Sequence, residues 1–562
     1  MNMLIDFLNK DRLTFFDGAM GTMIQAAGLK GGELPEMYNI THPEVIESIH
    51  RAYIEAGADV ITTNTFGANS LKLNPLGITP DTMISAAVGI ARKAAGERLV
   101  ALDIGPLGQL MAPMGTLTFQ AAYDLFASQI KAGQNAGADL ILIETMSDLY
   151  EAKAAVLAAK ENSNLPVACT LTFQQNGRTL MGNDPLTVIT VLEGLGVDVL
   201  GVNCSLGPKD LLPIVEKFTS YSHVPVLVQA NAGLPTLVNG QSEYELDPET
   251  FADSVEKMVL MGVKMVGGCC GTNPSFIKAL YNKLNDTDLV SRNIPRMTTV
   301  ASSRQTLIFD QGFKVIGQSI NPSGRDDLTE AVINGDMDIL YDEAIAQKQA
   351  GAEILDINVY VRNTNEAEKM VQAIEYLQSM LPIPLQIDSA DYKVLEAGAR
   401  IYNGKPIINS VNGTRSSMEH IFPIVKKYGA CVIALTMDEG GIPQKAEQKL
   451  EVARKILETA ASYGILKDDI IVDCLMQSAE IQASSSIETL KAISLIKREL
   501  GVKTILGISN ISYGMKERSS LNSAYLAMAL GAGLDSAILD TSSKEVKEVL
   551  KIYRSSDLSD LL

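Results

Sequence analysis

The sequence predicts an α/β protein made of two consecutive (β/α)8 barrels, and a repeated pattern is the first observation behind this prediction. A helix ends at a glycine, a small or acidic residue follows, and a short apolar strand comes next, as in Ala56–Ile61 and Ala136–Ile141. Glycine ends such helices in the left-handed conformation. Weaker copies of the pattern begin at Leu195, Ala350 and Tyr428. Strands that alternate with helices in this way indicate parallel βα units.

The number of these units is the second observation. Eight strands can be placed in the first half of the chain and eight in the second, and eight parallel strands with alternating helices close into a barrel of about 250 residues. Two barrels therefore account for nearly all of the 562 residues. The first eight strands are expected at Thr14–Gly18, Asp59–Thr65, Leu99–Pro106, Asp139–Thr145, Val167–Phe173, Val197–Cys204, Val224–Asn231 and Val263–Cys270.

Helices are expected between these strands, and Pro43–Ala56 shows the signals that define one. Thr41–Glu44 has the spacing of a capping box, in which the Thr and Glu side chains satisfy free backbone N–H groups. The alternation of strands and helices then stops between Asp286 and Ser303, a polar stretch that contains Pro295. We therefore expect one domain over residues 1–285, a linker over 286–303 and a second domain over 304–562.

The second domain repeats the arrangement of the first. Its strands are expected at Val315–Asn321, Ile354–Val359, Pro384–Ser389, Pro406–Val411, Cys431–Met437, Ile470–Leu475, Thr504–Ser512 and Asp535–Asp540.

Composition narrows the class of protein. A net charge of −19 disfavours binding to nucleic acid or to an anionic membrane surface. No run of about 18 apolar residues is present, so no membrane-spanning helix is expected, and residues 1–12 lack the apolar core of a signal peptide. Six cysteines in a chain of this length do not make a disulfide framework. These features predict a cytoplasmic protein with reduced thiols.

Three cysteines stand where predicted strands end. Cys269 and Cys270 follow the apolar run Val263–Val266, and Asn273 with Pro274 after them has the pattern of a helix N-cap. Cys204 ends a similar run. If both strands belong to one closed barrel, the three thiols meet at one rim, and three protein ligands with one open position describe a catalytic zinc site. The alternative is that they are small buried apolar side chains, as free cysteines often are.

Polar residues gather at the same predicted rim of the first barrel. Asp17, Asp103 and Glu144 each stand at the carboxyl end of a predicted strand, where active sites of such barrels lie. The alternative for each carboxylate is a structural role, capping a loop or pairing with a lysine.

These residues carry a resemblance to the homocysteine S-methyltransferase family. The matching segments are Asp17–Thr22, Thr63–Phe66, Asp103–Pro106, Asn203–Ser205 and Gly267–Gly271. The resemblance implies a zinc ion bound by Cys204, Cys269 and Cys270, with the sulfur of homocysteine as the fourth ligand. It also implies that Glu144 holds the amino group of the substrate and that Asp17 lines the amino-acid pocket.

The strand ends of the second barrel carry a different set of side chains. They include Asp356, Asp388, Asn409, Asp473 and Asn510, without a cluster of histidine or cysteine. Carboxylates and amides can pair with the donors and acceptors of a flat heterocycle such as a pterin.

This second set resembles the pterin-binding methyltransferase barrel, through Leu355–Asn358, Gln386–Ser389, Ile408–Ser410 and Gly507–Asn510. The resemblance implies Asp388, Asn409 and Asp473 as contacts of the pterin ring, with Asn510 near the reacting nitrogen N5. Two positions depart from the family pattern. Gln318 and Ser319 replace a Glu-Arg pair, and Tyr360 replaces a small residue.

The two barrels together, in this order, resemble the first half of the cobalamin-dependent methionine synthase family. The resemblance implies transfer of a methyl group from 5-methyltetrahydrofolate, through a cobalamin carrier, to zinc-activated homocysteine. None of the four histidines has the Asp-x-His-x-x-Gly setting of a cobalt ligand. Cobalamin is therefore expected on another domain or on a separate corrinoid protein, and the chain is expected to be either a fragment or a protein with such a partner.

Other functions fit parts of the pattern. The first barrel could methylate homocysteine from another donor, with the second barrel a degenerate pterin-binding scaffold. The chain could instead be a binding module that stores a pterin and docks a corrinoid protein. A dihydropteroate synthase activity of the second barrel is a further alternative, although no clear basic pyrophosphate-binding loop is found there.

Overall fold

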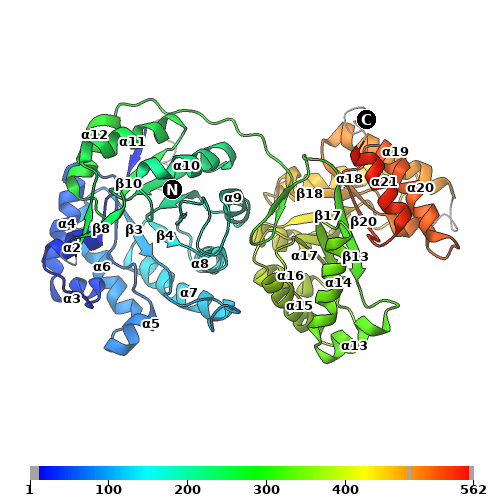
Figure 1. Cartoon of the computed structure of the whole chain (residues 1–562), viewed down its shortest axis with the longest axis horizontal. Helices are drawn as coiled ribbons and strands as arrows, with labels where there is room; N and C mark the ends of the chain where they lie inside the picture. Colours follow the sequence, from blue (N-terminus) through cyan, green and yellow to red (C-terminus); the bar gives the residue numbers. More distant parts are fainter. Residues whose placement is uncertain (1–11, 239–240, 477–482, 556–562) are drawn as a thin grey trace. The chain divides into compact units, whose positions relative to one another are not determined.

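The computed structural model describes residues 12–238, 241–476 and 483–555. The chain divides into two compact units, Met1–Ile294 and Pro295–Leu562. In each unit, eight parallel strands form a central barrel and helices surround it (Figure 1). The predicted fold class, two consecutive (β/α)8 barrels, is confirmed.

The first barrel is closed by a contact between its first two strands. Its sheet runs β1-β10-β7-β6-β5-β4-β3-β2, and a parallel bridge between Phe16 and Val60 joins the two ends. Its strands are β1 (Thr14–Phe15), β2 (Val60–Thr62), β3 (Leu99–Ile104), β4 (Leu140–Met146), β5 (Val167–Leu171), β6 (Val199–Asn203), β7 (Val226–Ala230) and β10 (Met265–Gly268). An antiparallel hairpin of β8 (Pro235–Val238) and β9 (Gln241–Tyr244) follows β7.

Helices cover the outside of this barrel. They are α2 (Met20–Ala26), α3 (Tyr38–Thr41), α4 (Pro43–Ala56), α5 (Ser70–Leu73), α6 (Pro80–Ala95), α7 (Phe119–Ala136), α8 (Leu149–Asn162), α9 (Pro185–Gly194), α10 (Pro208–Tyr221), α11 (Pro248–Leu260) and α12 (Pro274–Leu284), with short 3-10 turns η1 (Pro35–Met37) and η2 (Asn74–Leu76). The N-cap predicted for α12 is confirmed, because the Asn273 side chain accepts a hydrogen bond from the N–H of Ser275.

The capping box predicted at the start of α4 is wrong. Thr41 is the last residue of α3, and its hydroxyl donates to the carbonyl of Met37 rather than to the start of α4. The N-cap position falls on His42, which makes no side-chain capping bond. The capping-box pattern fails because the short helix α3, which precedes α4, already uses the Thr41 hydroxyl for a hydrogen bond of its own.

Inward-facing strand residues fill the first barrel. The core cluster consists of Phe16, Val60, Leu99, Ala101, Leu140, Leu142, Ala168, Val199, Leu227 and Met265, all at most 1% exposed. Bulky residues such as Phe16, Leu227 and Met265 and the small residues Ala101 and Ala168 fill the ring together. This packed interior leaves the polar chemistry to the residues beyond the carboxyl ends of the strands.

The second barrel is closed directly by pairing of its first and last strands. Its strands are β13 (Lys314–Ile320), β14 (Ile354–Ile357), β15 (Leu385–Asp388), β16 (Ile407–Asn412), β17 (Cys431–Leu435), β18 (Ile470–Asp473), β19 (Lys503–Gly507) and β20 (Ser536–Leu539). Its helices are α13 (Asp326–Asn334), α14 (Met337–Gln349), α15 (Glu366–Met380), α16 (Tyr392–Ile401), α17 (Arg415–Tyr428), α18 (Ala446–Ser462), α19 (Ala483–Leu500), α20 (Arg518–Gly531) and α21 (Lys544–Ser555), with 3-10 turns η3 (Lys467–Asp469) and η4 (Ile508–Ser512).

Most strands of the second barrel end one or two residues before the predicted residue, and β19 shows the largest difference. The strand expected to reach Ser512 ends at Gly507, and Ile508–Ser512 forms the 3-10 turn η4. Apolar residues continue through this turn, so hydrophobicity alone did not mark the boundary. Asn510 is therefore carried by a turn beyond the strand.

A small hairpin seals the amino-terminal end of the second barrel. Strands β11 (Thr299–Ala301) and β12 (Thr306–Ile308) pair antiparallel. Val300, Leu307 and Phe309 pack in one cluster with strand residues of the barrel, and Ala301 exchanges backbone hydrogen bonds with Lys405. The last part of the expected linker, from Thr299, is thus built into the second unit.

None of the described helices is both long enough and apolar enough to cross a membrane bilayer.

Cutting the chain between the two units should leave both folded. Arg292 anchors the end of the first unit, because its guanidinium donates to the carbonyls of Ser222 and Val224 at 2.8 and 2.6 Å. Thr298 is buried in the second unit, so residues 293–297 carry the junction. With a specific protease site inserted after Pro295, each unit should keep its circular dichroism and its own cooperative unfolding transition after cleavage. Unfolding of either half on cleavage would show that it depends on the other.

Candidate functional site

Three thiols gather at the carboxyl ends of β6 and β10. The sulfur atoms of Cys204, Cys269 and Cys270 lie within 4.8 Å of one another, and those of Cys204 and Cys270 are 3.8 Å apart. Among the residues that the structure describes, this is the only group of three His, Cys, Asp or Glu side chains close enough to share a metal ion. All six cysteines of the chain are unpaired.

The backbone that presents these thiols is fixed by β7, which lies between β6 and β10. The N–H of Cys204 donates to the carbonyl of Gln229 at 3.0 Å, and the N–H of Cys269 donates to that of Ala230 at 2.8 Å. Cys204 has a φ of 59°, in the left-handed region that residues with a side chain rarely adopt. This conformation turns the chain sharply at the end of β6.

Glycine is required beside the cysteine pair. Gly271 has a φ of 83°, and a Cβ on it would come within 2.3 Å of the ring of Tyr244. A Cβ on Gly268 would lie 2.3 Å from the hydroxyl oxygen of Thr272. The glycines thus let the chain pass between these side chains while Cys269 and Cys270 reach the cluster.

The three thiols perturb one another. Hydrogen bonds from Cys204 and then Cys269 lower the pKa of Cys270, whereas the hydrogen bond to Cys204 raises the pKa of Cys269 well above its usual value. One thiolate is therefore stabilised by two neutral thiols. Three sulfur donors within a few ångströms suit zinc or another soft cation, which would replace the shared protons.

Four carboxyl groups lie around the opening of the barrel at the carboxyl ends of its strands, which we call its mouth. Burial raises the pKa of Asp17 to about 7 and that of Glu144 to about 8. Burial also raises the pKa of Glu36, and that of Asp103 rises further because Glu144, Glu36 and Asp17 are near. Such a cluster favours either protonation or a bound cation such as an ammonium group.

The partners of these carboxyl groups differ. Both oxygens of Asp17 accept hydrogen bonds from Thr62, at 2.8 Å from its N–H and 3.0 Å from its hydroxyl. In contrast, one oxygen of Asp103 and one of Glu36 are buried without a hydrogen-bond partner among the described residues. Sequence reasoning missed Glu36, which lies on the 3-10 turn η1 and not at a strand end. Its only sequence signal is an acidic residue between Pro35 and apolar Met37.

Asn203 links the thiol cluster to Glu144. Its side-chain oxygen accepts hydrogen bonds from the N–H of Thr145 and the hydroxyl of Thr170, both at 2.9 Å. Its amide donates to the hydroxyl of Thr145 at 2.8 Å. Thr145 has a φ of 61°, so these bonds hold a strained residue directly after Glu144. The same buried side chain thereby sets the strand ends that carry Glu144 and Cys204.

The mouth of the second barrel brings three predicted residues together. Asp356 accepts a hydrogen bond from the Gln386 amide at 2.5 Å and another from Asn409. Asp388 pairs with Asn409 in the register of β15 and β16 and accepts from the Asn358 amide at 3.1 Å. Burial raises the pKa of both carboxyl groups, and for Asp356 the nearby Asp388 adds to the rise.

The other two predicted residues come from the ends of later strands. Asp473 ends β18 and is buried, which raises its pKa to about 6. Asn510 lies on η4 and is exposed. No hydrogen bond joins either side chain to Asp356, Asp388 or Asn409 among the described residues.

The positions that depart from the family pattern make neutral contacts. Ser509 donates its hydroxyl to the side-chain oxygen of Gln318 at 2.9 Å. The N–H of Ser319 donates to the side chain of Gln347 at 3.1 Å. This chain lacks both charges of the Glu-Arg pair that Gln318 and Ser319 replace, so no buried charge is left without a partner. The neutral hydrogen bonds still connect β13 to its neighbours.

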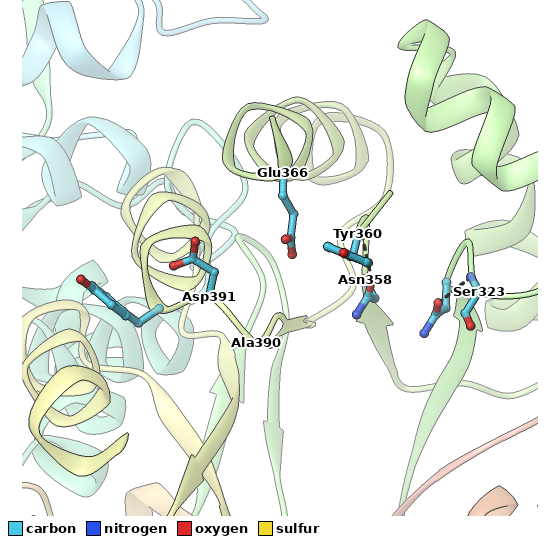
Figure 2. A pocket seen from close by; sticks show the side chains of 8 residues that line it. Ser323, Asn358, Tyr360, Glu366, Ala390 and Asp391 are labelled. Carbon is cyan, nitrogen blue, oxygen red and sulfur yellow. Dashed lines mark hydrogen bonds between the residues drawn. The ribbon is translucent and has the colours of Figure 1, made fainter. Parts of the chain in front are cut away.

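A pocket of about 750 Å³ opens beside Asp388 at this mouth. It is lined by Asn321, Ser323, Asn358, Tyr360, Glu366, Ala390, Asp391 and Tyr392. Figure 2 shows Glu366 projecting between Asp391 on one side and Asn358 with Tyr360 on the other. Asn358 connects the pocket to the predicted ring-binding residues through its bond to Asp388. Tyr360, the second departure, is 61% exposed here.

Comparison with known families finds a match for each unit. Residues 14–284 match the homocysteine S-methyltransferase family, and residues 320–540 match the pterin binding enzyme family. The first barrel is therefore similar to one family and the second barrel to the other.

Individual relatives are similar over both units. A methionine synthase of Mycobacterium leprae is 34% identical over 94% of this chain, and one of Mycobacterium tuberculosis is 34% identical over 96%. The chain spans about half the length of these curated relatives, 47% and 48%. Among solved structures, the metallated homocysteine methyltransferase MmuM of Escherichia coli is 24% identical, covering 50% of this chain and 98% of its own, with a TM-score of 0.43. A dihydropteroate synthase of Xanthomonas albilineans is 17% identical, covering 46% and 98%, with a TM-score of 0.37.

Replacing Asn203 should loosen the first barrel at its mouth. Asn203→Ala removes three hydrogen bonds and leaves buried partners unsatisfied, which costs about 1–3 kcal/mol. Urea titration should show this loss in the unfolding transition of the first unit. Asn176→Ala, in an exposed turn, is the control and should change the free energy of unfolding by less than about 0.5 kcal/mol. Equal stability of the two variants would contradict the role given to Asn203.

Proposed function

We propose that this chain is a methyltransferase of methionine synthesis. It would move a methyl group from 5-methyltetrahydrofolate, by way of a cobalamin carrier, to homocysteine. The observation that carries the proposal is the cluster of three thiols beside four carboxyl groups at one barrel mouth, of which three are buried and that of Glu144 is half-buried. The similarity to methionine synthases over both units supports it.

In the first barrel, Cys204, Cys269 and Cys270 would hold a zinc ion. When bound, zinc acts as a Lewis acid that lowers the pKa of a thiol in its open position, so that the substrate sulfur reacts as a thiolate. The protein supplies the geometry, since hydrogen bonds to β7 and the flanking glycines fix the backbone around the three cysteines.

The carboxyl groups would bind the amino-acid part of homocysteine. Glu144 would accept hydrogen bonds from the substrate ammonium group, and Asp17, already held by Thr62, would shape the wall of the pocket. The partnerless oxygens of Asp103 and Glu36 add negative potential around that ammonium. A cation is the ligand that lets such buried carboxyl groups stay ionised at neutral pH.

In the second barrel, 5-methyltetrahydrofolate would bind through its pterin ring. Asp388, Asn409 and Asp473 would accept and donate hydrogen bonds along the ring, and Asp356 would hold Asn409 from behind. Asn510 would hydrogen-bond near N5, positioning the nitrogen that loses the methyl group rather than acting as a strong acid. The neighbouring pocket has room for the aromatic part of the folate. The carboxylates of Glu366 and Asp391 would repel those of the folate, which would therefore point toward solvent.

The carrier would come from a corrinoid-binding domain or protein. Cobalamin supplies a metal centre that accepts and releases the methyl group, and its residues are expected outside this chain. A cytoplasmic location is part of the proposal, since six cysteines in a chain of this length do not make a disulfide framework.

Zinc content should depend on each of the three cysteines. Wild-type protein should bind one zinc ion per chain, with zinc–sulfur distances of about 2.3 Å by X-ray absorption. Replacing any one of them by alanine should leave substoichiometric zinc after dialysis against a chelator and should abolish homocysteine methylation. Cys169→Ala, in β5 of the same barrel, is the control and should keep full zinc. Full activity in zinc-free wild-type protein would overturn the metal assignment.

Folate binding should depend on the second barrel's polar mouth. Calorimetric titration with 5-methyltetrahydrofolate should give micromolar affinity in the wild type. Asp388→Ala should weaken it roughly ten- to a hundredfold, because loss of a charge-assisted hydrogen bond costs about 1.5–3 kcal/mol. Asn510→Ala removes a neutral hydrogen bond, worth about 0.5–1.5 kcal/mol, and should weaken it roughly two- to tenfold.

The control for this titration is Asp310→Asn. Asp310 pairs with Lys503 at the start of β19, away from the carboxyl ends of the strands, and the variant should bind normally. If the wild type gives no heat at millimolar ligand, the second barrel is a scaffold, and the first barrel would then methylate homocysteine from another donor.

A further inference from the structure

A fully buried lysine lies behind the strand end that carries Asp473. Lys449 belongs to α18, and its side chain is 0% exposed. Its ammonium group donates to the carbonyls of Cys474 and Leu475 at 2.8 and 2.5 Å and to the hydroxyl of Thr489 at 2.7 Å. These three acceptors use all three N–H bonds of the ammonium. Burying such a group without partners would be costly, so the turn after β18 and the lysine stabilise each other.

The turn held by Lys449 reaches the carboxylate of Asp473. The N–H of Leu475 donates to a side-chain oxygen of Asp473 at 2.8 Å. Leu475 has a φ of 36°, a conformation that leucine rarely adopts and that needs support from its surroundings. Support comes from its own carbonyl, which accepts from Lys449 and, at 3.1 Å, from Thr489.

We propose that Lys449 is a positioning residue for the second barrel: through the Cys474–Leu475 turn it holds Asp473 as a hydrogen-bond-accepting carboxylate for the pterin. This inference rests on the proposed function only for the identity of the ligand. The geometry of the turn belongs to the protein alone. Nothing in the sequence pattern marks Lys449, which stands in the first turn of an ordinary amphipathic helix.

The charges around this group set the expected pH dependence. Burial raises the pKa of Asp473 to about 6, while the N–H of Leu475 and then the charge of Lys449 lower it. Lys449 itself faces Cys474, Asp473 and Glu488. Asp473 is thus ionised above pH 6, and ligand binding that needs the carboxylate should be lost as the pH falls through that value. Without the lysine charge, the loss should begin at a higher pH.

The test compares Lys449→Met with wild type. Lys449→Met keeps the length of the side chain and removes the ammonium. Its affinity for 5-methyltetrahydrofolate at pH 7 should fall about ten- to a hundredfold, and the low-pH midpoint of binding should move upward. Lys455→Met, on the exposed side of the same helix, is the matched control and should change neither quantity.

A second measurement needs no ligand. The titration of Asp473 can be followed by carbon-13 NMR of protein labelled at aspartate, with the signal assigned by Asp473→Asn. The midpoint should lie near 6 in wild type and higher in Lys449→Met. Should that variant fail to fold, Thr489→Val removes one support of the same turn and should shift the midpoint in the same direction by a smaller amount.

The outcomes separate this inference from the proposed function. Wild type that does not bind the folate, but whose Asp473 midpoint still rises in Lys449→Met, would overturn the folate assignment and support the positioning role. Folded variants whose Asp473 midpoint equals that of wild type would overturn the positioning role, even where affinity falls.

Discussion

The hydrogen bonding of a single strand, β7, is the constraint on which the first site depends. Two successive residues of this strand, Gln229 and Ala230, accept hydrogen bonds from the N–H groups of Cys204 and Cys269, which follow the strands on either side. Cysteines 65 residues apart in sequence are thereby set side by side in space. In a parallel barrel all strands end at one rim, so the register of β6, β7 and β10 determines the spacing of the three sulfur atoms.

The two mouths handle buried charge in different ways. In the first barrel, Asp103 and Glu36 keep carboxylate oxygens without partners among the described residues, and three acidic neighbours raise the pKa of Asp103 further. Such an arrangement is unfavourable in isolation and becomes favourable when a cation enters. In the second barrel, amide groups of Gln386, Asn358 and Asn409 already pair with the carboxyl groups.

Support for these residues comes from groups one step farther from the mouths. Asn203 fixes the residue after Glu144, and Lys449 fixes the turn after Asp473. Both are fully buried. Each acts on a residue with positive φ at a strand end, Thr145 in the first barrel and Leu475 in the second. The two barrels thus stabilise strained strand ends with one buried polar side chain that makes three hydrogen bonds.

The sequence by itself determined the fold class and the kinds of side chain at each mouth. Glycine after several of the helices and apolar strands in a regular order are local signals, and they located all sixteen barrel strands. The Gly-Gly-Cys-Cys-Gly segment predicted thiols at a strand end, and the structure brings these thiols together with that of Cys204. Two local predictions were wrong. The Thr41 side chain bonds within α3 instead of capping α4, and the apolar residues after Gly507 form a 3-10 turn instead of continuing the strand. Only the tertiary structure decided which buried side chains stand behind the mouths. Glu36 lies on a 3-10 turn and Lys449 in the first turn of a long helix, where no spacing marks them. Their partners are 31 residues away for Glu36 and 25 to 40 residues away for Lys449, and such contacts exist only once the strands have closed into barrels.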